Sequence, residues 1–305
     1  MRSAAIDIGT NSIRLLISEY EGSGFRILER RMEITRIGKN LGISKNILRK
    51  SADAAAEVLK KYSLLMQEHG VERYRAVGTS AVRKAANSGW FMSYIKDNTG
   101  IEIEEITGEE EAWLSFLGAS TELKTRSRIL VVDIGGGSTE FILGNSDLEL
   151  DFNESIDIGS VSLSERFIKS DKPTNSELKD MQGYIKDRIR PVINKVRVKD
   201  ELTLAGVAGT ITTIAAIDLK LKKYDSGKIH HHILKGRRVN SIYNLLCGLT
   251  LKERRRVRGL QPERADIIIG GAAILVEIIS LLEVESLMVS EKDILDGIIY
   301  SLTKF

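Results

Sequence analysis

One local pattern occurs twice in this chain and limits the folds open to it. Residues 5–12 read Ala-Ile-Asp-Ile-Gly-Thr-Asn-Ser, and residues 131–138 read Val-Val-Asp-Ile-Gly-Gly-Gly-Ser. Each segment is an apolar strand that ends in Asp-Ile-Gly, followed by a tight polar turn and a second apolar strand. Asp7 and Asp133 are 126 positions apart (133 minus 7), a plausible length for one half of a two-domain protein. The repeat therefore predicts two similar strand–turn–strand units.

Both turns have the composition of a phosphate-binding turn. Glycine allows backbone N–H groups to approach an anion closely, and nearby hydroxyl groups add further donors. The candidate phosphate-binding residues are Thr10, Asn11 and Ser12 in the first turn and Gly135, Gly136, Gly137, Ser138 and Thr139 in the second. A turn that binds nothing is the alternative, but a plain hairpin would seldom contain three consecutive glycines, because each costs chain entropy. Two such turns facing each other across a cleft indicate chemistry on a chain of phosphates.

Acidic residues flank both turns. Asp7 precedes the first turn, and Asp133 and Glu140 lie on either side of the second. Carboxylates are suited to holding a hydrated Mg²⁺ next to phosphate oxygens, whose charge the ion neutralises. We therefore expect Asp7, Asp133 and Glu140 to be metal-binding residues.

A third candidate segment joins a predicted strand to a predicted helix. Residues 78–83 read Gly-Thr-Ser-Ala-Val-Arg. Backbone donors, the hydroxyls of Thr79 and Ser80 and the guanidinium of Arg83 could all bind one anion there. A helix cap next to an exposed arginine explains the same residues equally well.

A similar turn follows a later predicted strand. Residues 206–210 read Gly-Val-Ala-Gly-Thr, in which Gly209 and Thr210 are candidate phosphate-binding residues. Close packing of a tight strand–helix turn is the alternative explanation of these small residues.

Three consecutive acidic residues, Glu109, Glu110 and Glu111, lie at another strand-to-helix junction. Acids in the first turn of a helix complement its dipole, and from the residues alone this structural explanation is as good as a functional one. The functional explanation makes one of them the general base that accepts a proton from an attacking water. The spacing does not decide which one.

The order of predicted elements begins again near the middle of the chain. Strands are predicted at 3–8, 13–20, 25–37, 74–77 and 101–106, with helices at 51–69, 90–98 and 107–118; the second set has strands at 128–135, 138–144, 149–158, 202–205 and 286–289 and helices at 160–169, 175–195 and from 292. We predict an α/β protein with an N-terminal domain at 1–121 and a C-terminal domain at 122–305. The helix at about 292–305 is a candidate to pack back on the first domain.

The composition excludes several classes of protein. Of the 305 residues, 42% are hydrophobic and 29% are charged, as in an ordinary soluble protein. The net charge of +3 is too small to indicate nucleic-acid binding by itself. The only cysteine, Cys247, excludes an intramolecular disulfide, and its apolar neighbours predict that it is buried. We expect neither a leader peptide nor a membrane span, and hence a cytoplasmic protein without a membrane or nucleic-acid partner.

Two further segments have plain explanations. His230, His231 and His232 are adjacent, and adjacent side chains of a strand point to opposite faces, so we do not expect them to bind zinc together. The basic segment 252–258 reads Lys-Glu-Arg-Arg-Arg-Val-Arg. It is expected to be a solvated helix face, although it could also hold the distal phosphates of a long polyanion.

Taken together, the motifs resemble those of the exopolyphosphatase/guanosine pentaphosphate phosphohydrolase family. The resemblance rests on the segments at 7–12, 78–83, 108–112, 133–140 and 206–210 and on two closing segments at 262–266 and 289–297. They occur in the family's order over essentially the whole chain. The resemblance implies two ribonuclease-H-like domains of the actin-like, sugar-kinase-like superfamily around a central cleft. It also implies the short two-domain form of the family, with a homodimer as a candidate assembly.

The same resemblance implies roles for individual residues. Glu111, which precedes Ala112, is implied to be the base that activates water. Mg²⁺ is implied near Asp133 and Glu140, and Arg83 and both glycine turns are implied to bind phosphate. Many relatives have arginine after the Glu-Ala pair, whereas this chain has Trp113, which removes one cation from the site.

The expected reaction is Mg²⁺-dependent hydrolysis of the terminal phosphoanhydride of inorganic polyphosphate, which releases phosphate. Guanosine pentaphosphate is a second candidate substrate. The residues alone leave two other classes of protein open. One is an ATP-dependent kinase of the same superfamily, and the other is a sensor that binds polyphosphate or a nucleotide without turnover.

Overall fold

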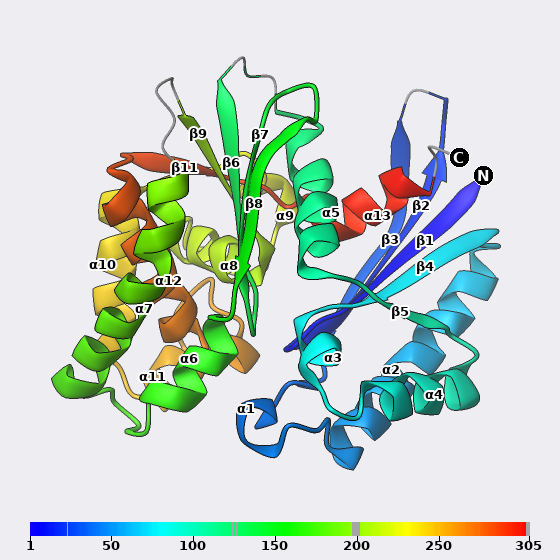
Figure 1. Cartoon of the computed structure of the whole chain (residues 1–305), viewed down its shortest axis with the longest axis horizontal. Coiled ribbons are helices and arrows are strands. Elements are labelled where there is room, and N and C mark those ends of the chain that lie inside the picture. Colours follow the sequence, from blue (N-terminus) through cyan, green and yellow to red (C-terminus); the bar gives the residue numbers. More distant parts are fainter. Residues whose placement is uncertain (23, 124, 126, 197–201, 303–305) are drawn as a thin grey trace. The chain divides into compact units, whose positions relative to one another are not determined.

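The computed structural model describes residues 1–22, 24–123, 125, 127–196 and 202–302 (Figure 1). It divides into two compact units: Met1–Gly118 together with the C-terminal segment that starts at Ile294, and Ala119–Asp293. The first boundary thus falls close to the predicted end of the N-terminal domain at residue 121. The last helix belongs to the first unit, although the residues that precede it, 119–293, form the second unit.

The first unit is built on one mixed sheet with the order β3-β2-β1-β4-β5 in the described residues. Its strands are β1 (Arg2–Ile8), β2 (Ser12–Tyr20), β3 (Phe25–Ile34), β4 (Arg73–Gly78) and β5 (Ile103–Glu105). The first three strands pair antiparallel, and β4 and β5 add in parallel on the other side of β1. The helices are α1 (Leu41–Ser44), α2 (Arg49–Glu68), α3 (Ser80–Lys84), α4 (Ser88–Thr99), α5 (Gly108–Ser120) and α13 (Ile294–Ser301).

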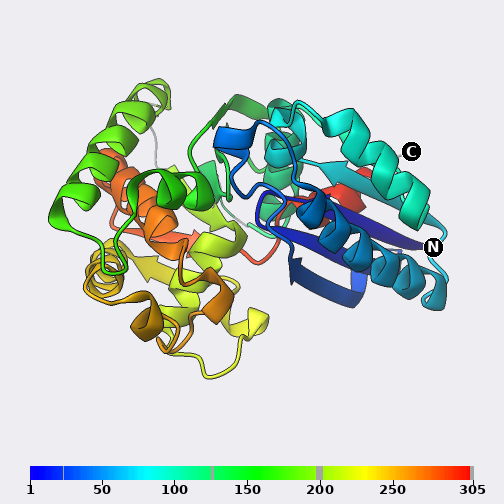
Figure 2. The ribbon, with the colours of Figure 1, turned by 90° about the horizontal axis from the view of Figure 1, so that it is seen from below.

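Both faces of this sheet are covered because β1 is apolar on both sides. Ala4, Ile6 and Ile8 alternate along the strand and belong to the core that includes α2 and α4. Those two helices lie side by side (Figures 1 and 2). Ala5 lies on the opposite face and packs with residues of α13. Trp113 packs against this second core, so it has a structural role.

The second unit repeats the sheet of the first and extends it by one strand. Its order in the described residues is β10-β11-β9-β6-β7-β8. The strands are β6 (Arg128–Ile134), β7 (Thr139–Gly144), β8 (Leu150–Ile156), β9 (Leu202–Val207), β10 (Ile233–Lys235) and β11 (Ser286–Val289). Antiparallel β6, β7 and β8 correspond to β1, β2 and β3, and parallel β9 and β11 correspond to β4 and β5.

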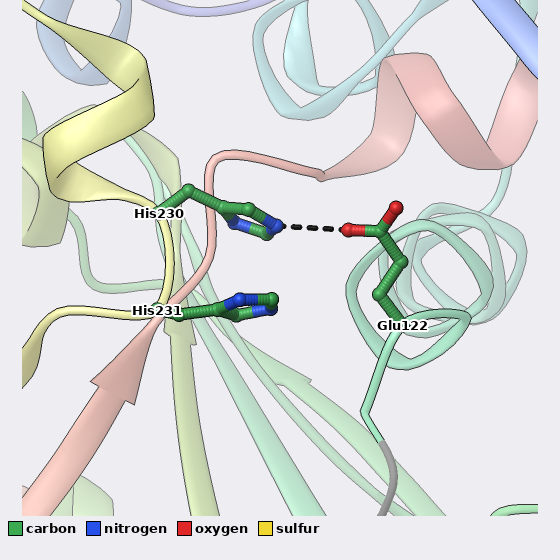
Figure 3. A group of neighbouring side chains, drawn as sticks. All are labelled: Glu122, His230 and His231. Carbon is green, nitrogen blue, oxygen red and sulfur yellow. Dashed lines mark hydrogen bonds and ion pairs between the residues drawn. The ribbon is translucent and has the colours of Figure 1, made fainter.

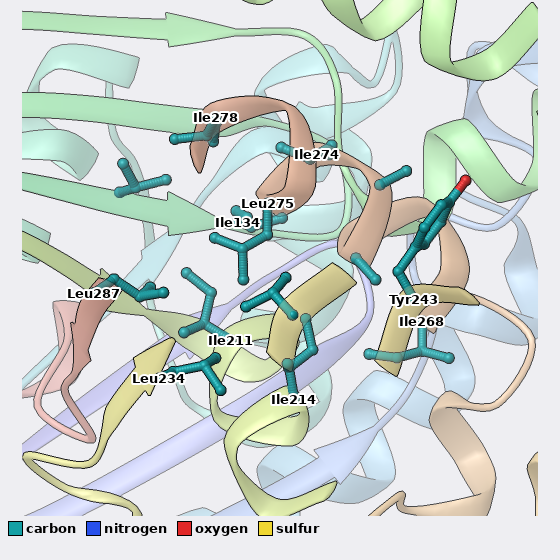
Figure 4. Close-up of a cluster of buried hydrophobic side chains, with 14 of the residues drawn as sticks. Ile134, Ile211, Ile214, Leu234, Tyr243, Ile268, Ile274, Leu275, Ile278 and Leu287 are labelled. Carbon is teal, nitrogen blue, oxygen red and sulfur yellow. The ribbon is translucent and has the colours of Figure 1, made fainter. Parts of the chain in front are cut away.

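Helices make up most of the rest of this unit: α6 (Ser160–Phe167), α7 (Asn175–Lys195), α8 (Ala208–Asp218), α9 (Ser226–Ile229), α10 (Gly236–Cys247), α11 (Leu251–Arg254) and α12 (Ile268–Leu282), with a 3₁₀ turn at Pro262–Arg264. The apolar helix α12 lies at the centre, where Ile274, Leu275 and Ile278 meet Ile211 and Ile214 of α8 (Figure 4). Cys247 is buried as predicted, and burial raises the pKa of its thiol to about 11. None of the helices in the described residues combines the length and apolar character needed to cross a bilayer.

Two of the differences from the sequence-based expectation concern β3 and β10. The strand expected at 25–37 ends at Ile34, because the N–H groups of Thr35 and Arg36 leave the sheet and donate to the Asn11 carbonyl. Arg36 adopts a left-handed conformation with φ of 52° to do so. The short strand β10 was not expected, since three residues are too few to show an alternating pattern.

Replacement of Gly297 should test how α13 is held in the first unit. A Cβ at this position would overlap the carbonyl oxygen of Leu114 in α5, so Gly297→Ala should destabilise the protein by about 1–3 kcal/mol. Gly183→Ala is a matched control, because Gly183 is also helical but has no atom near its ideal Cβ. The control should be neutral or stabilising by up to about 1 kcal/mol. Thermal unfolding midpoints that fall equally in both variants would contradict this close approach.

A pH-dependent contribution to stability should come from Glu177 at the start of α7. The N–H groups of Thr174, Lys169 and Ser170 donate to its carboxylate and lower its pKa to about 2. This folded-state pKa lies below the unfolded pKa of about 4.3. The stabilisation from Glu177 is therefore complete at pH values above about 4.3 and is lost as the pH falls toward 2. Glu177→Gln should therefore lower the urea midpoint at pH 7 and have a smaller effect at pH 3. An equal drop in the urea midpoint at pH 7 and at pH 3 would argue against this stabilisation by Glu177.

Candidate active site

The two repeated turns close with the same hydrogen bond. In the first unit the N–H of Gly9 donates to the Ser12 carbonyl, and in the second the N–H of Gly135 donates to the Ser138 carbonyl, both at 3.0 Å. A Cβ at position 9 or 135 would lie 3.2 or 3.3 Å from that carbonyl, closer than side chains normally pack. Glycine is therefore favoured at the same point of both turns.

Backbone hydrogen bonds fix the orientation of the first turn. The carbonyl of Thr10 accepts from the N–H of Gly38 at 3.0 Å, and that of Asn11 accepts from Thr35 and Arg36 at 3.1 and 2.9 Å. In a trans peptide the N–H points opposite to the C=O of the preceding residue. The N–H groups of Asn11 and Ser12 therefore point away from the segment that holds the carbonyls.

The second turn is held in the same way by the start of α6. The carbonyl of Gly135 accepts from the N–H of Ser160 at 2.9 Å, and that of Gly136 accepts from Val161 at 2.8 Å. By the same reasoning, the N–H groups of Gly136 and Gly137 point away from α6. Consecutive N–H groups with a common direction form the kind of concavity that binds phosphate.

Two buried side chains next to the first turn lack partners. Neither Oδ1 nor Nδ2 of Asn11, nor the hydroxyl of Ser80, has a hydrogen-bond partner among the described residues, and they are only 7% and 3% exposed. Ile8 pairs with Gly78, so the turns after β1 and β4 share one edge of the sheet. The Thr79 hydroxyl, by contrast, donates to the Ile8 carbonyl at 3.4 Å. Buried polar groups normally have partners, and phosphate oxygens could accept hydrogen bonds from Nδ2 of Asn11 and from the Ser80 hydroxyl.

Asp7, a predicted metal ligand, forms an ion pair with Arg14, the residue opposite it on β2. The Nη2 and Nε atoms of Arg14 donate to Oδ2 of Asp7 at 2.7 and 2.9 Å. Arg14 thus supplies positive charge at a place where the sequence suggested a cation. The assignment of Asp7 to a metal site stays a prediction.

The three acids at the start of α5 have different environments. Glu109 is exposed, and Glu110 forms an ion pair with Arg75. Glu111 is 12% exposed at its side chain, and its Oε2 accepts from Nη1 of Arg83 at 3.0 Å. Of the three, Glu111 is thus the one that contacts the arginine of the predicted anion-binding segment.

The carboxylates of Asp133 and Glu140 lie on the same side of the second sheet, because the two residues are directly opposite in the β6–β7 ladder. They are 8% and 1% exposed, and the Ser155 hydroxyl donates to Oε1 of Glu140 at 2.8 Å. Carboxylate oxygens from both residues on one side of the sheet are ligands of the kind that a hard cation prefers. This donor set fits a hard divalent ion such as Mg²⁺.

Arg264, which was not among the site residues predicted from the sequence, lies against the turn at 206–210. The guanidinium of Arg264 occupies the space in which a Cβ of Gly209 would lie, at the first turn of α8. Gly209 therefore makes room for an arginine next to the N-terminus of a helix, and both favour an anion. The Pro-Glu-Arg segment at 262–264 was a noted motif, but its distance in sequence from residue 209 hid the contact.

Two predicted phosphate-binding hydroxyls are engaged in packing. The hydroxyl of Thr139 donates to the Ile158 carbonyl at 2.8 Å, and the residue is fully buried. Thr210 is 3% exposed and lies against Gly271 of α12, where a Cβ would approach within 2.5 Å of its Cγ2. For Thr139, a contact to phosphate would have to come from the backbone N–H.

The expectation that His230 and His231 point to opposite faces is wrong. Their rings stack with centroids 3.8 Å apart, because the segment is not a strand and His231 adopts a left-handed conformation with φ of 64° (Figure 3). Nε2 of His230 lies 2.9 Å from Oε2 of Glu122. One ligand atom from each of these three residues lies within 4.8 Å of the others, a spacing at which a metal ion could be held.

The hydrogen bonds of His230 nevertheless argue for a structural role. Its Nδ1 accepts from the N–H of Glu291 at 3.2 Å, so the neutral ring carries its proton on Nε2, which then donates to Glu122. Lys292 also binds Glu122, at 2.7 Å. The imidazole therefore ties the segment after α5 to the segment before α13.

Comparison with known proteins identifies the family of this chain. The model of the Ppx/GppA phosphatase family matches residues 16–304. This chain belongs to the Ppx/GppA phosphatase family. The expected fold class, two ribonuclease-H-like α/β units of the actin-like type, is confirmed by the repeated strand order and by the solved structures of the family.

Among curated Ppx/GppA relatives, Exopolyphosphatase 2 of Mycobacterium tuberculosis is 37% identical over 316 residues, which cover 99% of this chain and 98% of that protein. A guanosine-5'-triphosphate,3'-diphosphate pyrophosphatase of Photobacterium profundum is 27% identical over 98% of this chain and 59% of its own length. An exopolyphosphatase structure from Cytophaga hutchinsonii has a TM-score of 0.92 at 28% identity and covers 99% of this chain and 97% of its own. The structure of the Aquifex aeolicus family member has a TM-score of 0.84 at 32% identity and covers 100% of this chain and 98% of its own.

Replacement of Gly159 should test whether α6 fixes the second turn. A Cβ there would lie 2.5 Å from the backbone of Gly136 and Gly137, so Gly159→Ala should displace the turn and destabilise the protein by about 1–3 kcal/mol. Hydrogen exchange should accelerate at the amides of Val161 and Ser162, which donate to the Gly136 carbonyl. Unchanged exchange at both amides would show that the turn does not depend on this contact.

Proposed function

We propose that this chain is an exopolyphosphatase that hydrolyses the terminal phosphoanhydride of inorganic polyphosphate with Mg²⁺ and releases phosphate, with guanosine pentaphosphate as a second substrate. Family membership, the 37% identity to Exopolyphosphatase 2 and the identity to a guanosine-5'-triphosphate,3'-diphosphate pyrophosphatase support this reaction. The observation that carries the proposal is the ion pair between Glu111 and Arg83. It joins a carboxylate that can accept a proton to a cation that can hold a phosphate.

The proposed chemistry needs only a base, positioned donors and charge neutralisation. A water oxygen attacks the terminal phosphorus, the bridging P–O bond breaks toward the rest of the chain, and Glu111 accepts the proton of the water. Arg83, the N–H groups at the first turn, Nδ2 of Asn11 and the hydroxyl of Ser80 bind phosphate oxygens in the first unit.

The second unit contributes the remaining groups. The turn at 135–138, Gly209 and Arg264 would bind further phosphate oxygens through N–H groups and a guanidinium. Asp133 and Glu140 would hold Mg²⁺, which when bound supplies neutralisation of phosphate charge. Desolvation of the phosphates would strengthen all of these contacts.

Glu111→Gln should separate hydrolysis from its alternatives. Phosphate release from long-chain polyphosphate with Mg²⁺ and no added acceptor should fall by a factor on the order of 10²–10⁴, since the amide cannot accept the proton. Glu109→Gln is the matched control, because Glu109 is exposed and belongs to the same helix turn. It should retain wild-type release.

Other outcomes would assign a different function. Phosphate transfer only after an acceptor is added would indicate a kinase. Binding of polyphosphate without any release by the wild type would indicate a sensor. Equal release by wild type and Glu111→Gln would leave hydrolysis in place but remove Glu111 from the role of base.

A further inference from the structure

Two exposed basic segments lie in the second unit, outside the residues proposed for catalysis. Lys220, Lys222 and Lys223 follow the end of α8, and Lys252, Arg255, Arg256 and Arg258 lie in α11 and the loop after it. All seven side chains are exposed. Within the described residues none of the seven makes a hydrogen bond or ion pair through its side chain. We call these seven residues the basic surface.

The fold brings the two segments together at one carbonyl group. The N–H of Leu221 donates to the Ala216 carbonyl at 3.1 Å. Gly259 has a φ of +91° and packs so closely on the same carbonyl that a Cβ would overlap it. Both segments therefore meet at the C-terminal end of α8, although about 30 residues of sequence separate them. The negative end of a helix dipole favours cations at this place.

The loop that presents the arginines is held firmly. Arg254 is only 3% exposed, and its Nε and Nη1 atoms donate to the carbonyls of Ala265 and Leu249 at 2.9 and 2.7 Å. The one acid within the segment, Glu253, accepts from the N–H and hydroxyl of Thr250 at 2.8 Å and thereby caps α11. The segment thus uses one arginine and one acid to fix its shape and leaves four cations exposed.

Such a cluster raises the energy of the folded chain through repulsion between like charges, unless a polyanion binds it. Both of its segments also lead to the proposed phosphate-binding turn. The chain runs from Gly259 to Arg264, whose guanidinium lies against Gly209 at the opposite end of α8. Since α8 has 11 residues, the basic surface lies roughly 16 Å from that turn. A chain of three phosphates is too short to reach from one to the other, whereas a long linear chain can.

We propose that the basic surface binds the distal phosphates of long inorganic polyphosphate while phosphates nearer the end of the chain lie at the turn formed by residues 206–210. The inference rests on the proposed function and adds a determinant of substrate length to it. Ionic contacts with a linear polyanion have little directional demand, so several flexible cations suit it better than a shaped pocket. The surface should therefore contribute to KM for long chains and leave the chemical step unchanged.

Two triple variants test the proposal. One carries Arg255→Gln, Arg256→Gln and Arg258→Gln, and the other carries Lys220→Gln, Lys222→Gln and Lys223→Gln. A third protein with Lys61→Gln, Lys186→Gln and Arg190→Gln is the matched control, because it loses the same charge at exposed positions elsewhere. Kinetic constants are measured for tripolyphosphate and for chains of several hundred phosphates, at low and high salt.

Both basic-surface variants should raise KM for the long chain by about tenfold, with kcat unchanged, and should leave both constants for tripolyphosphate as in the wild type. The salt dependence of KM for the long chain should become shallower. An unchanged KM for long chains, an equal rise for tripolyphosphate, or the same rise in the control protein would each overturn the proposal.

Direct binding keeps this test separate from the test of the proposed function. Affinity for long polyphosphate is measured in a Glu111→Gln background, with and without the basic-surface substitutions. If long polyphosphate binds more tightly to the protein without those substitutions, the basic surface binds polyphosphate, even if the wild type releases no phosphate. If single-stranded RNA of equal charge displaces long polyphosphate at lower concentration, the surface is a nucleic-acid site and the proposal fails.

Discussion

The orientation of two short backbone turns is the constraint on which the rest of the structure depends. In each unit the carbonyls after the first strand are bound by N–H groups from a later segment, Thr35 to Gly38 in one case and Ser160 to Val161 in the other. Peptide planarity then turns the intervening N–H groups to the opposite side. Each unit thus presents aligned donors at the end of its central strand, which carries Asp7 in one unit and Asp133 in the other.

Small residues make this arrangement possible because backbones and cations must approach closely. Gly159 lets the start of α6 touch the second turn, and Gly209 makes room for the guanidinium of Arg264. Gly297 does the same for the contact between α13 and α5. These three glycines are far apart in the sequence, yet each lies at a close contact between two segments of the fold.

Much of the fold could be predicted because its signals are local. The repeated Asp-Ile-Gly segment indicated both hairpins, and apolar alternation indicated most strands, although β3 ended early where Thr35 and Arg36 bind the first turn. The contact of Glu111 with Arg83 distinguishes it from Glu109 and Glu110, which spacing alone could not do. The position of Arg264 and the stacking of His230 on His231 depend on long-range packing and a left-handed residue, and no local pattern encodes either.

The central claim is that both turns bind phosphate through their backbone N–H groups. Nuclear magnetic resonance of the ¹⁵N-labelled Glu111→Gln protein, titrated with tripolyphosphate and Mg²⁺, tests it most directly. The account predicts saturable shifts of the amide signals of Asn11 and Ser12 and of Gly136 and Gly137. Amide signals that stay unchanged at both turns, while saturable shifts occur elsewhere in the protein, would contradict it.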